Sequence, residues 1–192
     1  MPEIARRPAL PASGEPSPGV AVTLAALPPA ARFVLRGEPA AVAAAGRAFG
    51  VALPRRINAA SAQGARCAVM LGPDEWLLIA DDAAAPGATA ALARDLGDAL
   101  GAAPHSLVDV SHRQTAIRVE GHEAELTLNA AVPLDLSDEA FPVGMATRTI
   151  LEKAEIVLWR TGPKAFRVEV WRSFAPYVMD LLSAVARENV PD

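Results

Sequence analysis

The sequence has little cysteine, few aromatic residues and no long hydrophobic run, and each shortage excludes a class of protein. Cys67 is the one cysteine among 192 residues, so an internal disulfide and a Cys-based zinc site are both excluded. We therefore expect a reducing compartment, the cytoplasm. No stretch approaches the roughly 20 apolar residues that cross a bilayer. Arg6 and Arg7 are not followed by the apolar segment of a signal peptide, so we expect a soluble chain with no membrane partner.

Positive charge is also scarce. The chain has 18 lysines and arginines against 22 acidic residues, a formal net charge of -4. Nucleic-acid binding needs a cationic surface, so we expect no nucleic-acid partner. Hydrophobic residues make up 52% of the chain, which is enough to build a core and excludes wholesale disorder. The length permits one large domain or two small ones.

Proline is concentrated at the start of the chain. Seven of the 17 prolines fall within the first 29 residues. Proline lacks the N–H donor that helices and central strands require, so residues 1–30 are predicted to form a flexible N-terminal arm. An alternative is that the arm becomes ordered by lying on a partner.

Beyond residue 30 the apolar spacing predicts regular elements. Helices are expected from Glu38-Pro39 to about residue 49, up to about Gly101, over 122–131, and after Ser173. The last of these carries an apolar stripe that includes Phe174, Tyr177, Val178 and Leu182. Strands are expected over 32–36, 67–71, 75–80, 105–110, 116–120, within 150–160, and over 166–171.

The second half restates the first. Gly37 and Gly121 each follow a strand and precede a helix, and Gly72-Pro73 and Gly162-Pro163 each turn a hairpin. Each half therefore has a split-βαβ, ferredoxin-like order of elements. We predict the α+β class, with two half-units over about 31–111 and 112–190 packed as one body in a single domain, 31–190. Chance recurrence of Gly-Pro turns is the alternative.

Two sets of polar residues invite a catalytic or metal-binding interpretation. Asp109, Ser111 and His112 carry the side chains of a triad, but close neighbours on an extended strand do not converge on one point. We expect Asp109 and Ser111 to hold a turn through bonds to the backbone. His105, His112 and His122 lack the i, i+4 spacing of a helical metal pair, so no metal site is predicted.

Cofactor motifs are absent as well. Neither GxGxxG nor GxxxxGK[ST] occurs. Five aromatic residues could stack on a planar ligand but are expected in the core: Trp76, Trp159, Phe166, Trp171 and Tyr177. Three acids that follow Pro133 are expected in a solvated loop: Asp135, Asp138 and Glu139. The residues themselves therefore predict no catalytic, cofactor-binding or metal-binding site.

A series of motifs in a fixed order is more specific. It consists of residues 71–77 (LGPDEWL), 109–113 (DVSHR), 128–129 (LN), 141–144 (FPVG), 148–149 (RT), 159–160 (WR) and 172–177 (RSFAPY). With this series the chain resembles the γ subunit family of heterotetrameric sarcosine oxidase over roughly residues 30–188. It is more distantly similar to the aminomethyltransferase (T protein) folate-binding fold.

The resemblance implies a role inside a complex. Heterotetrameric sarcosine oxidase oxidatively demethylates sarcosine to glycine, with oxygen reduced to hydrogen peroxide, and tetrahydrofolate captures the one-carbon unit as 5,10-methylenetetrahydrofolate. In that family FAD, FMN and NAD belong to the α and β subunits and zinc to the δ subunit. The resemblance thus implies a structural, non-catalytic γ subunit that contacts α directly, with β and δ in the same complex.

Two other functions remain open at this point. The first is a stand-alone folate-binding protein or aminomethyltransferase relative, in which Glu155 or Asp109 would face the folate. The T protein's hairpin is Gly-rich, whereas the corresponding residues 151–157 have no glycine. The second is a self-associating ferredoxin-like interaction module.

Overall fold

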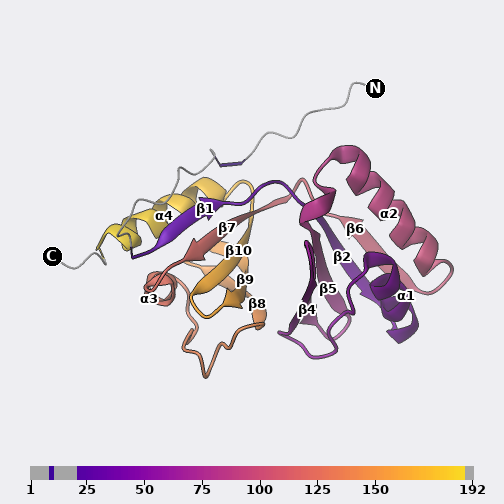
Figure 1. Cartoon of the computed structure of the whole chain (residues 1–192), viewed down its shortest axis with the longest axis horizontal. Coiled ribbons are helices and arrows are strands. Elements are labelled where there is room, and N and C mark those ends of the chain that lie inside the picture. The colour runs from indigo at the N-terminus through magenta and orange to yellow at the C-terminus, as the bar shows by residue number, and fades with distance from the viewer. Residues whose placement is uncertain (1–8, 11–20, 189–192) are drawn as a thin grey trace. The chain divides into compact units, whose positions relative to one another are not determined.

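The computed structural model describes residues 9–10 and 21–188. The chain forms two compact units, which are described separately. Of the described residues, unit 1 comprises those up to Pro29, His112–Val143 and those from Arg148 onward, and unit 2 comprises Ala30–Ser111 and Gly144–Thr147. Each unit contains helices and most of one five-stranded sheet (Figure 1). The predicted mixture of strands and helices is confirmed.

Unit 2 is built on a sheet with the strand order β3-β4-β5-β2-β6. Helices α1 (Pro39–Phe49) and α2 (Pro86–Leu100) pack together on one face of this sheet (Figure 1). A short 3-10 helix, η1 (Asp81–Ala83), precedes α2. The strands are β2 (Ala31–Gly37), β3 (Ala60–Gln63), β4 (Arg66–Gly72), β5 (Glu75–Ala80) and β6 (His105–Asp109).

Helix α1 follows the signals in its sequence. Glu38 has the extended backbone of an N-cap, and Pro39 occupies the first turn, where its missing N–H removes no helical bond. Gly50 ends the helix with a φ of 78° and donates its N–H to the carbonyl of Gly46. That left-handed conformation is unfavourable for residues with a Cβ, so glycine sets the end of the helix at this point.

Alternation along the strands gives unit 2 its core. Phe33 and Leu35 of β2 and Trp76 and Leu78 of β5 face α1 and α2 and are almost completely buried. Phe49, at the end of α1, is fully buried in the same cluster. Burial of this apolar surface is what holds the two helices on the sheet.

Unit 1 is built on a second sheet, with the order β1-β7-β10-β9-β8. Its strands are β1 (Thr23–Ala26), β7 (Gln114–Glu120), β8 (Ala146–Leu151), β9 (Ala154–Gly162) and β10 (Ala165–Trp171). Its helices are α3 (Ala124–Asn129) and α4 (Ala175–Glu188). The predicted alternation of β7 is confirmed, because Ile117 and Val119 are fully buried while Arg118 and Glu120 are exposed.

Strand β1 lies within residues 1–30, for which we predicted a flexible arm. Residues 23–26 instead pair with β7 in an antiparallel register, from Thr23 opposite Glu120 to Ala26 opposite Ile117. The proline-free stretch between Pro18 and Pro28 can donate to a ladder, and β7 supplies the partner edge. The prediction was therefore wrong for this stretch. Residues 1–8 and 11–20 of the arm lie outside the described residues.

Candidate functional site

Asp109 and Ser111 form a turn, as predicted. The Asp109 carboxylate accepts the backbone N–H of Ser111 at 2.8 Å. The Ser111 hydroxyl is buried and accepts the backbone N–H of Arg32 at 2.9 Å. His112 is exposed and takes part in none of these bonds. The Ser111 hydroxyl is thus committed to backbone groups and is not poised as a nucleophile.

The three histidines are separate and exposed. The Nδ1 atom of His105 bonds the carbonyl of Ala103 at 2.7 Å, and His122 lies 3.9 Å from a Glu123 carboxylate oxygen. Within residues 9–10 and 21–188, no group of three His, Cys, Asp or Glu side chains is arranged to hold a metal ion. In the same residues, no helix is long and apolar enough to span a membrane.

The three acids after Pro133 lie in an exposed loop, as predicted, but two of them have specific partners. Asp135 accepts the backbone N–H of Ser137 at 2.9 Å, and this bond lowers the pKa of its carboxyl below the ordinary 3.8. Asp138 pairs with the guanidinium of Arg160. Glu139 is exposed. Because Asp135 and Asp138 bond groups within unit 1, the loop belongs to the scaffold of that unit.

Arg160 of β9 is the organising residue of that loop; it belongs to the motif series, but no structural role was predicted for it from the sequence. Its side chain is buried and donates to the carbonyls of Leu136 and Phe141 at 2.9 and 3.0 Å, and to that of Pro163 at 2.7 Å. Its guanidinium also lies 5.0 Å from the centre of the Phe166 ring. A charged residue at an inward position of an alternating strand was the available signal.

The predicted aromatic core is only partly confirmed. Trp76 and Phe166 are buried, and Trp159 is half-buried. Trp171 and Tyr177 are each 39% exposed, so the prediction was wrong for these two. The physical reason is position: Trp171 is the last residue of β10, on the sheet face opposite Val170, and Tyr177 lies on α4 next to the fully buried Val178.

Glu155, the acid that a folate-binding function would use, is an exposed residue of β9. It follows a tight β8–β9 turn, in which Glu152 adopts a φ of 50°. Asp109, the other candidate, is exposed on β6 and engaged with Ser111. Neither carboxylate lines a described cavity.

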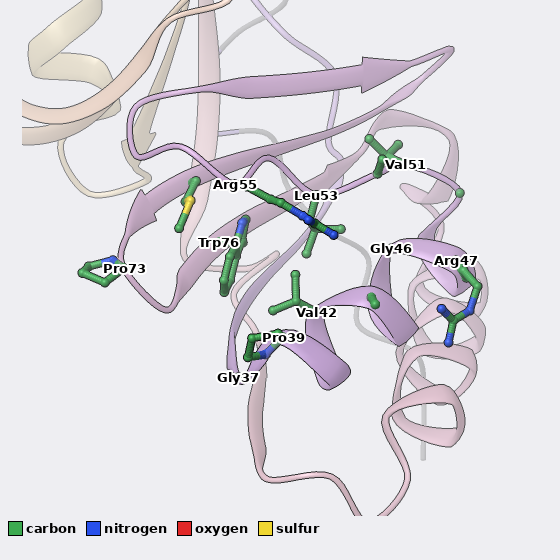
Figure 2. A pocket seen from close by; sticks show the side chains of 14 residues that line it. Gly37, Pro39, Val42, Gly46, Arg47, Val51, Leu53, Arg55, Pro73 and Trp76 are labelled. Atoms are coloured by element: carbon green, nitrogen blue, oxygen red, sulfur yellow. The ribbon is translucent and has the colours of Figure 1, made fainter.

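Unit 2 contains a cavity of about 660 Å³ between α1, the chain that follows it and the β4–β5 turn. Figure 2 shows Val42, Leu53 and Trp76 directed toward the same space, with Arg55 beside Leu53. The Trp76 indole donates its N–H to the Pro54 carbonyl at 2.9 Å, which fixes the plane of this wall. No sequence motif indicated the cavity.

The comparisons with known proteins now decide the family. Residues 36–188 match the model of the sarcosine oxidase, gamma subunit family. This chain belongs to that family. It is similar to the sarcosine oxidase subunit gamma of Corynebacterium sp. strain P-1, with 33% identity over 77% of this chain and 72% of the relative. It is also 33% identical to the subunit from Corynebacterium sp. strain U-96, over 84% of this chain and 78% of the relative.

Solved structures agree with the family. The fold matches a chain of the heterotetrameric sarcosine oxidase from Corynebacterium sp. U-96, with a TM-score of 0.81 and 31% identity over 94% of this chain and 90% of that chain. It also matches glycine cleavage system aminomethyltransferase T from Bartonella henselae, with a TM-score of 0.64 and 14% identity. That match covers 85% of this chain and 45% of the other, and it shows a shared fold. Both predicted similarities are confirmed.

Proposed function

We propose that this chain is the structural, non-catalytic γ subunit of a heterotetrameric sarcosine oxidase. The observation that carries the proposal is the match to a chain of such an enzyme, which spans 94% of this chain and 90% of the matched one. A match over nearly the whole of both chains is what the same subunit in two species would give. The function of the assembly is the oxidative demethylation of sarcosine to glycine, with release of hydrogen peroxide and formation of 5,10-methylenetetrahydrofolate.

The use of polar side chains within the units supports a non-catalytic role. Ser111 and Asp109 close a turn, and Arg160 and Asp138 hold a loop. Catalytic groups are normally left with unsatisfied or perturbed functional atoms that point into a cleft. The polar groups named here are instead bonded to backbone groups or, in the case of Asp138, to the Arg160 guanidinium. We therefore assign no catalytic residue to this chain.

The cofactors belong, in this proposal, to the other subunits. FAD, FMN and NAD would be held by the α and β chains, zinc by the δ chain, and tetrahydrofolate also outside this chain. The assembly would be cytoplasmic. The direct partner of this chain would be α, with β and δ in the same complex.

Exposed aromatic residues near the start of α4 offer a surface for the α subunit. Trp171, Phe174 and Tyr177 are 39%, 38% and 39% exposed. The Arg113 guanidinium lies 5.4 Å from the centre of the Trp171 ring. Trp, Tyr and Arg are the residue types that dominate the energetics of protein interfaces. We expect these residues, the aromatic surface, to contact the partner.

Co-purification tests the proposal. The four subunits are co-expressed with an affinity tag on α, and the amount of this chain recovered is measured for the wild type, for the double variant Phe174→Ala/Tyr177→Ala, and for Leu126→Ala. Leu126 is 55% exposed on α3 and serves as the matched control. We expect the double variant alone to lose most of its recovery, with an unfolding midpoint close to that of the wild type.

Two outcomes would contradict the proposal. The assigned role fails if the purified chain by itself releases peroxide from sarcosine. It fails equally if α, β and δ assemble and turn over sarcosine at the wild-type rate in the absence of this chain. Unchanged recovery of the double variant would instead refute only the choice of surface.

A further inference from the structure

The cavity of unit 2 is not used by the assembly role proposed above. Its fourteen lining residues all lie between Gly37 and Trp76, so the site is contained within one unit. A volume of about 660 Å³ falls within the usual range for small-molecule sites in proteins, 300–1,000 Å³. We propose that this cavity binds a small organic anion with a flat apolar body.

The walls of the cavity fit an apolar body. Val42 of α1 and Met70 of β4 lie on two sides, and the buried indole of Trp76 forms a third. The indole cannot turn freely, because its N–H is bonded to the Pro54 carbonyl at 2.9 Å. A fixed aromatic wall is suited to stacking against a flat ring and loses little conformational freedom when the ring binds.

The chain between α1 and β3 forms the remaining wall, and Gly46 sets its distance from the helix. A Cβ at Gly46 would lie 3.1 Å from the Val51 carbonyl oxygen and 3.3 Å from Cδ1 of Leu53. The backbone therefore approaches α1 closely at this point, and the space opens toward Ala43 and Pro39, which lie on exposed positions of the helix. The arrangement gives a cavity with a closed base and an open mouth.

The charges of the cavity are of one sign. Arg47 and Arg55 are the charged residues among those lining it. Both are exposed, and neither side chain has a salt bridge or hydrogen bond within the part of the chain that the structure describes. The nearest acids in the sequence do not line the cavity: Asp74 and Glu75 pair with Arg36, and Glu38 occupies the N-cap position of α1 without a side-chain capping bond.

Figure 2 shows Arg55 beside Leu53 and Arg47 farther along α1, so unpaired guanidinium groups on the cavity lining favour an anion. A guanidinium binds carboxylate or sulfonate oxygens through charge-assisted hydrogen bonds, and its planar shape permits two parallel bonds. An uncharged molecule of the same shape would gain the apolar contacts but not these bonds. The ligand class is therefore an aromatic or otherwise flat apolar carboxylate or sulfonate.

Fluorescence titration of the full-length chain tests the inference with two probes. The first is 8-anilinonaphthalene-1-sulfonate, and the second is N-phenyl-1-naphthylamine, which has the same aromatic skeleton without the sulfonate. We expect saturable binding of the sulfonate at one site per chain, and weaker binding of the neutral amine. Raising the salt concentration should weaken binding of the sulfonate but not of the neutral amine, because salt screens the exposed charges.

Four variants locate the binding site. Ala43→Trp places a large side chain at an exposed position of the mouth and should weaken both probes at least tenfold. Arg47→Gln and Arg55→Gln should weaken the sulfonate about three- to tenfold and leave the neutral amine unchanged. Arg56→Gln is the matched control, since Arg56 is also exposed, is adjacent to Arg55 in sequence and does not line the cavity. Circular dichroism checks that each variant is folded.

Several results of the titrations would overturn the proposal. The probe binds elsewhere on the surface if Ala43→Trp leaves the sulfonate affinity unchanged. The same conclusion follows if Arg56→Gln weakens sulfonate binding as much as Arg47→Gln and Arg55→Gln do. Absence of saturable binding would refute the site outright. If the titration succeeds with the free chain but fails with the assembled complex, the cavity holds a partner segment and the small-molecule proposal is wrong. The results with the free chain do not bear on whether the chain supports assembly.

Discussion

Removal of the Arg160 side chain should destabilise unit 1 severely, and the structure indicates by how much. In the variant Arg160→Met, the carbonyls of Leu136 and Phe141 lose their donor in a buried environment, and the partly buried carbonyl of Pro163 loses its shorter bond. The ion pair with Asp138 contributes little, because that carboxylate is 82% exposed.

The magnitude follows from the two buried acceptors. Each buried carbonyl left without a donor costs about 1–3 kcal/mol. Part of this cost is offset, since the buried guanidinium and its unpartnered Nε atom no longer have to be desolvated. We expect a net loss of about 3 kcal/mol in the free energy of unfolding. For a chain of this length that loss corresponds to a decrease of roughly 6–12 °C in the unfolding midpoint.

Urea unfolding followed by circular dichroism measures this effect, with Arg118→Met as the control. Arg118 belongs to the same sheet but is half exposed, and its ion pair with Glu120 spans 3.4 Å. We expect the free energy of unfolding of the control to lie within about 0.5 kcal/mol of the wild-type value. A free energy of unfolding for Arg160→Met that lies within about 1 kcal/mol of the wild-type value would refute the reasoning.

Three further predictions concern single contacts. Gly121→Ala should lower the free energy of unfolding by more than 2 kcal/mol, because φ is 140° and the new Cβ would lie 2.2 Å from a backbone oxygen. Its control is Gly64→Ala, which has open space around it and should lower the same quantity by about 1 kcal/mol in the urea assay. Trp76→Phe removes one hydrogen bond and should lower the free energy of unfolding by about 1 kcal/mol. The bond from Ser137 lowers the pKa of Asp135, so its carboxylate stabilises the fold above pH 3.8, and this contribution is lost as the pH falls through the folded-state pKa. Asp135→Asn should therefore reduce the difference in midpoint between neutral and acidic pH; an unchanged pH profile would contradict this.

Local patterns predicted the central elements well, for identifiable reasons. Strand β7 was predicted because Ile117 and Val119 face the core while Arg118 and Glu120 face solvent. Strand β10 has the same alternating sequence, although its polar residues Arg167 and Glu169 are also buried. Helix α1 was predicted because Pro39 and Gly50 fix its two ends through their own backbone preferences. Strands β1 and β3 lie at sheet edges, and their residues carry no strong alternation, so pairing with a neighbour decided their conformation.

The candidate sites also include features that the local sequence predicts and features that only tertiary packing decides. The interpretation of Asp109 and Ser111 as a turn was correct, since an Asp side chain that bonds the backbone two residues later is a local arrangement. The core positions expected for Trp171 and Tyr177 were wrong: Trp171 lies on the face of β10 opposite Val170, and Tyr177 lies at the flank of the apolar stripe of α4. The cavity arises where three separate segments meet, and no single segment carries its signature.

The sequence by itself determined the class of fold, the order of the central elements and, through its motif series, the family. These properties depend on residues close together in the chain, where backbone preference and apolar spacing act directly. The tertiary structure alone decided which carbonyls Arg160 satisfies, which aromatic residues remain exposed, and that Arg47 and Arg55 share a cavity with Trp76. Such features need groups distant in the chain to meet, and only packing of the completed units fixes their distances.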